Sequence, residues 1–169
     1  DISKNLRKIR ETVGYTTQEN SFYSKLSVYE NMRYYSNLYS VSKENIKKYL
    51  DDILKQVELF EARTTLAERI SGGMKRRLDF AISLVHDPSI LVLDEPTTGL
   101  DPILVKQFWE IVKKINEKGK TVIVSSHVFP EIQKNCKRVG IMNQGKIVHT
   151  VEMDKSKDEL FEIFQKNVK

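Results

Sequence analysis

Two adjacent acidic residues, Asp94 and Glu95, follow the apolar run 90–93. Such a run is typical of a parallel strand buried on both faces, and open parallel sheets bind their ligands beyond the carboxyl ends of the strands. Neighbouring carboxylates there repel each other and lose solvation, a cost that a metal ion or a reacting water offsets. We expect Asp94 to hold Mg²⁺, directly or through water, and Glu95 to take a proton from a water that attacks a phosphate. The alternative is a pair of carboxylates on a surface loop.

A second group, Ser71, Gly72 and Gly73, stands where a helix is predicted to begin. Glycines allow a ligand to approach the backbone closely, and the exposed amides and the dipole of a helix start favour an anion. The three cations at 75–77 oppose that dipole, which a bound polyanion or an acidic partner surface would explain. The alternative is a serine cap followed by a glycine turn.

His127 and Gln18 follow two further strand-like segments, residues 121–125 and 13–16. At the end of a parallel strand, His127 would reach a phosphate from the same edge of the sheet as Asp94. Taken alone, this histidine is better read as an ordinary loop residue. Gln18 alone indicates almost nothing.

The segments between these residues predict an α/β fold. A helix between two buried strands forms a βαβ unit, so we expect a parallel sheet layered with helices. The first predicted helix begins with a capping box of Ser27 and Glu30, and the second is capped by Ser42 and carries its apolar face over 46–57. The third spans 74–85 and ends by Asp87-Pro88, and the fourth runs from Asp101-Pro102 to Gly119. A terminal amphipathic helix after Asp154 carries Leu160, Phe161 and Phe164. Residues 139–142 and 146–148 flank Asn143-Gln144-Gly145 as a hairpin.

Composition sets broad limits. The chain has 169 residues, about one domain, and a net charge of +5 that suits nucleic acid, an anionic membrane, a phosphate ligand or simply a solvated surface. No apolar run approaches the ~20 residues of a membrane span. The single cysteine, Cys136, excludes an internal disulfide and a cysteine-rich zinc site, which fits a reducing cytosol.

Together the motifs resemble those of ATP-binding cassette (ABC) ATPases, in order and in spacing, from about residue 1 to residue 148. The matching segments are 14–18 with the Q-loop residue Gln18, 70–74 as the signature motif, 91–94 as Walker B with Glu95 as the catalytic glutamate, 98–101 as the D-loop, and His127 as the H-loop residue. The resemblance implies a P-loop NTPase-like parallel sheet with flanking helices and an inserted α-helical subdomain, truncated at the amino terminus. The implied domains are 1–20 as a remnant of the ATP-binding core, 21–70 as the helical subdomain, 71–150 as the signature helix and ATPase core, and 151–169 as a C-terminal helix.

The resemblance also implies a role for each position. Gln18 would contact Mg²⁺ and the attacking water, Asp94 would organise the metal, and Glu95 would polarise the water. His127 would hold the γ-phosphate of ATP. The signature residues Ser71, Gly72 and Gly73 would bind the γ-phosphate of ATP in the opposite subunit, with Asp101 at the seam between the two.

The implied partners are a transmembrane permease subunit and a second copy or a homologous cassette, at the cytoplasmic face of the membrane. No nucleic acid is expected. Many aromatic residues lie between Gln18 and Ser71, and those that are exposed are candidates for a groove that receives a helix of the permease.

Two departures qualify the resemblance. Met74 and Ile70 replace the Gln and Leu of many members, and the segments 74–78 and 97–102 look most like the cassettes of ABC-2-type exporters. The chain contains no G-x-x-x-x-G-K-[ST] loop, and seventeen residues precede Gln18, so we expect that loop to fall before Asp1. The chain alone should then bind ATP weakly and be inactive.

Two other interpretations stay open. The chain could be a truncated, non-catalytic fragment or a regulatory half that supplies only the signature motif. It could also be an ABC protein that acts on nucleic acid, although such proteins usually carry two cassettes or a long insertion, and neither is visible in the sequence.

Overall fold

The computed structural model describes residues 4–153 and 160–168. Two compact units make up the chain, Asp1–Ser125 and Ser126–Lys169. Each is described by itself.

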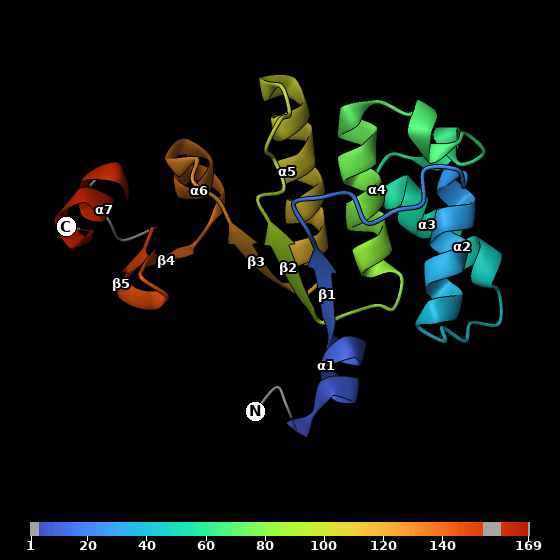
Figure 1. Cartoon of the computed structure of the whole chain (residues 1–169), viewed down its shortest axis with the longest axis horizontal. Helices are drawn as coiled ribbons and strands as arrows, with labels where there is room; N and C mark the ends of the chain where they lie inside the picture. Colours follow the sequence, from blue (N-terminus) through green and yellow to red (C-terminus); the bar gives the residue numbers. More distant parts are fainter. Residues whose placement is uncertain (1–3, 154–159, 169) are drawn as a thin grey trace. The chain divides into compact units, whose positions relative to one another are not determined.

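The first unit contains a three-stranded parallel sheet (Figure 1). Its strands are β1 (Val13–Thr16), β2 (Ile90–Asp94) and β3 (Thr121–Ser125), in the order β1-β2-β3. Thr16 lies opposite Leu93, and Asp94 lies opposite Ser125. The predicted parallel sheet is confirmed, and its strands end at one common edge.

The helices of the first unit follow the predicted pattern with two differences. They are α1 (Leu6–Thr12), α2 (Val28–Leu38), α3 (Ile46–Gln56), α4 (Gly72–Leu84) and α5 (Pro102–Glu117), with short 3₁₀ turns η2 (Phe60–Ala62) and η3 (Ala67–Arg69). The capping box of Ser27 and Glu30 is confirmed. Ser42 does not cap α3; Asn45 does, accepting a hydrogen bond from the Lys48 amide. The helix α1 carries no buried residue, so its sequence gave no amphipathic pattern to detect.

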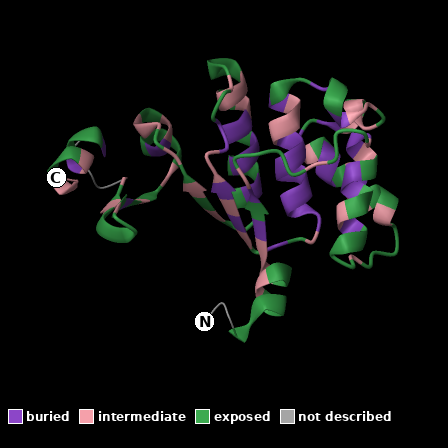
Figure 2. Cartoon of the chain, viewed as in Figure 1, coloured by how far each residue is buried: buried purple, intermediate pink, exposed green. Residues whose placement is uncertain are grey.

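The part of the core that covers the sheet of the first unit lies on one of its faces, against α4 and α5, and further buried residues lie in α2 and α3 (Figure 2). Leu91 and Leu93 of β2 are fully buried there, as is Phe80 of α4. On the other face Tyr15 and Ile123 are each 54% exposed, with the half-buried Val92 between them in register. The expectation of strands buried on both faces is therefore wrong for this structure. An apolar run does not reveal which of its faces is covered.

The second unit contains α6 (Phe129–Asn135), β4 (Arg138–Asn143), β5 (Lys146–Glu152) and α7 (Leu160–Asn167). The predicted hairpin is confirmed, since β4 and β5 pair antiparallel and Asn143 pairs with Lys146. Gln144 and Gly145 make the turn with φ of 48° and 75°, the left-handed values that a two-residue hairpin turn requires.

The predicted terminal helix is confirmed over the residues of α7, and its first part, 154–159, lies outside the described residues. The Phe129 ring of α6 packs edge-on against Phe161 and Phe164, with centroids 5.6 and 5.1 Å away. In the described ranges of both units, no helix combines the length and the apolar character that a membrane span needs.

Candidate functional site

Asp94 ends strand β2, and two hydroxyl groups from the neighbouring strands orient its carboxylate. The Ser125 hydroxyl of β3 donates to Asp94 Oδ1 at 2.5 Å, and the Tyr15 hydroxyl of β1 donates to Oδ2 at 3.4 Å. The parallel register produces this arrangement because it places Ser125 directly opposite Asp94. The half-buried carboxylate is thus held at the edge of the sheet in one orientation.

Glu95 stands at the sharp turn that follows the strand. Its φ of 45° lies in the left-handed region, which is strained for a residue with a side chain. The amide of Glu95 donates to the carbonyl and the hydroxyl of Ser125 at 3.2 and 3.1 Å, and these bonds hold the turn. The Thr98 hydroxyl donates to the Glu95 carboxylate at 3.2 Å. Both predicted carboxylates therefore lie at the strand edge, fixed by partners and not free on a loop.

The donor set at this edge fits a magnesium ion. Mg²⁺ binds through one or two carboxylates, retains several waters and takes phosphate oxygens for the rest, so it does not need a cage of protein ligands. Asp94 supplies one oriented carboxylate, and Gln18 could supply an amide oxygen. Over residues 4–153 and 160–168, no group of three His, Cys, Asp or Glu side chains forms a metal cage.

Ser71 caps helix α4, accepting a hydrogen bond from the Met74 amide at 3.3 Å. Gly72 is exposed, and a Cβ added to it would meet nothing within 4 Å. A Cβ on Gly73 would lie 2.8 Å from the Leu104 side chain of α5, so this glycine allows α4 and α5 to pack closely. Packing thus accounts for the second glycine, while the first leaves open space for a ligand at the helix start.

Internal partners account for two of the three cations that follow the glycines. Arg77 is buried and donates to the Glu58 carboxylate at 2.8 Å and to the Gln107 side chain at 2.5 Å. Arg76 donates to the Thr17 carbonyl at 3.2 Å. No bound polyanion is therefore needed to explain why these two cations stand near the positive pole of the helix. The sequence could not show this, because their partners lie 19 to 59 positions away.

Gln18 follows β1 in an exposed turn and shares a pocket with the start of α4. The pocket has a volume of about 400 Å³ and is lined by Gln18, Glu19, Asn20, Gly72, Lys75, Arg76, Thr98, Gly99 and Leu100. The structure therefore brings the predicted Q-loop, signature and D-loop segments around one hollow. Asp94 and Glu95 do not line it, although Asp94 ends the strand next to β1 and Glu95 follows directly.

Asp101 caps helix α5, accepting hydrogen bonds from the amides of Ile103 and Leu104 at 2.9 and 3.0 Å. It is exposed, as a residue at a subunit seam would be before assembly. His127 lies two residues beyond the end of β3 and belongs to the second unit. The role predicted for each of these residues stays a prediction.

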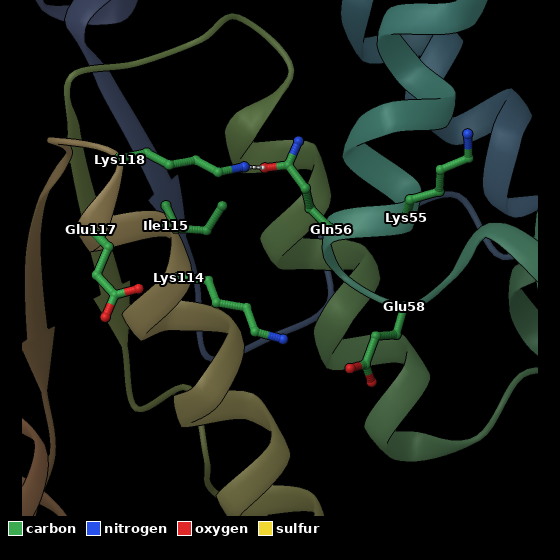
Figure 3. Close-up of a pocket in the computed structure, with 7 residues that line it drawn as sticks. All are labelled: Lys55, Gln56, Glu58, Lys114, Ile115, Glu117 and Lys118. Carbon is green, nitrogen blue, oxygen red and sulfur yellow. Dashed lines mark hydrogen bonds between the residues drawn. The ribbon is translucent and has the colours of Figure 1, made fainter.

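A second pocket, of about 410 Å³, lies where α3 and α5 end (Figure 3). Lys55, Gln56, Glu58, Lys114, Ile115, Glu117 and Lys118 line it, and the Lys118 ammonium donates to Gln56 at 2.7 Å. Because α5 starts just beyond the carboxyl edge of the sheet and runs back toward the start of β3, its last turn lies at the opposite edge from Asp94. Lysines near the end of a helix complement its negative pole, which accounts for them without a ligand.

Three partners in the site were not indicated by the sequence: Tyr15, Ser125 and Thr98, the hydroxyl donors to Asp94 and Glu95. Ser125 and Tyr15 come from the two strands that flank β2. The strand prediction could have found Ser125, since the last residues of neighbouring parallel strands meet at the same edge. Tyr15 and Thr98 carry no such signal.

Comparisons with known proteins identify the family of the chain. The model of the ABC transporter family matches residues 1–98. The linearmycin resistance ATP-binding protein LnrL of Bacillus subtilis is 37% identical over 147 residues, which cover 87% of this chain and 47% of that protein. The lantibiotic transport ATP-binding protein SrtF of Streptococcus pyogenes is 35% identical over 165 residues, covering 98% and 68%.

Among solved structures, cbiO1 of Clostridium perfringens, part of the ABC transporter complex cbiONQ, superposes with a TM-score of 0.82 at 28% identity, over 90% of this chain and 61% of that one. This chain thus spans about half the length of LnrL and some three fifths of cbiO1. The extent of the family match and the likeness to SrtF decide the assignment: the chain belongs to the ABC transporter family of ATP-binding proteins.

Proposed function

We propose that this chain provides the catalytic and signature segments of an ABC exporter ATPase, which couples ATP-driven dimerisation and ATP hydrolysis to export through a membrane partner. One observation carries the proposal: Asp94 and Glu95, side by side at the end of β2, are each fixed by hydroxyl donors. A carboxylate pair held this way is suited to organise a metal–phosphate group and a water next to it.

Each residue then has one task. Asp94 and Gln18 would hold Mg²⁺, which when bound neutralises the charge of the β- and γ-phosphates. Glu95 takes the proton of the attacking water, an effect typically worth about 10²–10⁴-fold in rate. By the family resemblance, His127 would bind the γ-phosphate. Thr98 keeps the Glu95 carboxylate in place while the backbone turn holds its strained φ.

The start of α4 serves the nucleotide of the neighbouring subunit. Ser71, Gly72 and Gly73 present the helix amides and an open surface at Gly72 to a γ-phosphate. Asp101 lies at the seam between two copies or two homologous cassettes. Closure of the two subunits on ATP and their release on hydrolysis would then drive the cycle.

The membrane partner would dock on the helical segment, with the protein bound peripherally at the cytoplasmic face of the membrane. Tyr23 and Tyr34 are 48% and 41% exposed there, and their rings pack edge to face with centroids 4.8 Å apart. Tyr35 packs against both rings. Rigid, exposed aromatic side chains of this kind are suited to receive an amphipathic helix of a permease.

The test is a chimaera that carries, in front of Asp1, the phosphate-loop segment of a complete relative. We expect it to release phosphate from Mg-ATP, and we expect Glu95→Gln to slow that release by about 10²-fold or more while ATP binding persists. Thr98→Val is the companion variant and should give a smaller loss, because it removes only the donor to Glu95. Equal rates with and without the Glu95 carboxylate would refute the catalytic assignment.

The same chimaera separates the alternative function, a regulatory half. In that case it would not hydrolyse ATP itself, yet it would support hydrolysis by a partner cassette whose own signature serine is mutated. Ser71→Ala in the chain should abolish this support.

A further inference from the structure

The loop that carries Gln18, residues 17–21, is attached to helix α4 at both of its ends. At the first end, the Arg76 guanidinium donates to the Thr17 carbonyl at 3.2 Å. At the second end, Asp79 Oδ1 accepts hydrogen bonds from the amide and the hydroxyl of Ser21, both at 2.8 Å. Because Arg76 and Asp79 are three residues apart, they lie on the same face of the helix.

The second attachment depends on Asp79, a carboxylate that is buried at a cost in solvation free energy. Asp79 is 1% exposed, and burial raises the pKa of its carboxyl group, against which the two bonds from Ser21 act. A buried carboxylate without compensating hydrogen bonds is strongly disfavoured. The Tyr35 hydroxyl also donates to the Ser21 carbonyl, so the amide, hydroxyl and carbonyl of Ser21 are all held.

Between the two attachments the loop is free to meet a ligand. Gln18, Glu19 and Asn20 are exposed and line the same pocket as Gly72. Helix α4 is continuous from Gly72 to Leu84, and at about 1.5 Å per residue its cap is only about 12 Å from Asp79. A displacement at the start of this helix therefore carries both ends of the Gln18 loop with it.

We propose that Arg76 and Asp79 are positioning residues that clamp the Gln18 loop to the signature helix. This inference rests on the proposed function, because it connects two sites defined there. The signature end of α4 meets the neighbour's nucleotide, and Gln18 serves the nucleotide of its own subunit. The clamp makes α4 the rigid link by which the engagement of one nucleotide sets the position of the residue that serves the other.

The experiment uses the full 169-residue chain with two readouts: hydrogen exchange of the Ser21 amide, and cleavage after Glu19 by a glutamate-specific protease. Asp79→Ala should accelerate both by about tenfold or more, as expected when a hydrogen bond to a charged group is lost. In Asp79→Asn, the exchange rate and the cleavage rate should both stay within about threefold of wild type, because an amide oxygen still accepts from Ser21. Asp52→Ala, at an exposed carboxylate of α3, is the matched control.

Exchange of the Leu93 amide in the central strand serves as the internal reference for global opening. If Asp79→Ala accelerates exchange of the Leu93 and Ser21 amides equally, Arg76→Met provides the deciding test, because methionine keeps most of the aliphatic stem of arginine but has no donor. This variant should accelerate cleavage after Glu19 by roughly fivefold. Unchanged cleavage in Arg76→Met, or Asp79→Asn behaving like Asp79→Ala, would overturn the clamp.

These readouts do not involve catalysis, so the two proposals fail separately. A chimaera unable to hydrolyse ATP would remove the proposed function and leave the exchange result standing. Unaltered exchange in the clamp variants would remove the clamp even if hydrolysis depends on Glu95.

Discussion

Replacing Gly14 with alanine should destabilise the first unit more than any other glycine substitution there. A Cβ at Gly14 would lie 2.3 Å from the Ser83 carbonyl oxygen of α4, 2.8 Å from the Leu91 side chain and 2.9 Å from Pro88. The nearest of these atoms is backbone and cannot rotate away. Relief requires β1 to move away from α4, which strains its pairing with β2.

We expect a loss of about 2–3 kcal/mol in the free energy of unfolding, the usual cost of overpacking a core that cannot yield. With a typical urea dependence, this loss lowers the unfolding midpoint by roughly 1 M. Trp109 is the single tryptophan of the chain and lies buried in α5, so its fluorescence reports unfolding of the first unit.

Gly72→Ala is the matched control, because the new Cβ would meet nothing within 4 Å. Alanine is also the better helix former, so this variant should be neutral or more stable by up to about 1 kcal/mol. A Gly14→Ala midpoint within about 0.2 M of wild type would refute the steric reasoning. So would an equal loss in the Gly72→Ala control.

Three further predictions concern charge and ligand binding. The His86 ring stacks on Tyr39 and forms a hydrogen bond with the Val13 carbonyl, and burial lowers its pKa. Below about pH 6.5 the unfolded chain therefore binds a proton at His86 more readily than the folded chain does. Stability should therefore fall as pH drops from about 6.5 through the folded pKa; urea midpoints at pH 7.5 and 5.5 should show this decrease, and His86→Phe should reduce it. Arg77→Ala should lower the free energy of unfolding more than Glu58→Ala in the same assay, because it removes a buried side chain together with its hydrogen bonds to both Glu58 and Gln107; equal losses would contradict this. Isothermal titration of the 169-residue chain with Mg-ATP should give no micromolar binding, because these residues contain no G-x-x-x-x-G-K-[ST] loop and such a loop supplies most of the affinity for the phosphates. A micromolar Kd would show the expectation to be wrong.

The sequence predicted the elements well wherever local chemistry determines them. Asp101 followed by Pro102 marks the start of α5 because a carboxylate accepts from the first helix amides and proline needs no donor there. The same logic failed at Ser42, since a second capping residue, Asn45, stands directly before Ile46, the first residue of α3. When two side chains of similar capping strength compete, packing decides between them, and packing is not local.

The site shows where this limit matters most. Residue types and order were enough to indicate that Asp94 and Glu95 stand at a strand edge, because strand ends and acidic pairs are visible in the sequence. The side chains that hold them, Tyr15 and Ser125, are 79 and 31 residues away from Asp94, and only the register of the sheet brings them together. The same holds for Asp79, a buried carboxylate of α4, whose partner Ser21 is 58 residues away. Lys75, Arg76 and Ser83 share the helix face of Asp79, so the sequence does not mark this carboxylate as buried. Only the contact with Ser21 identifies the loop that Asp79 holds.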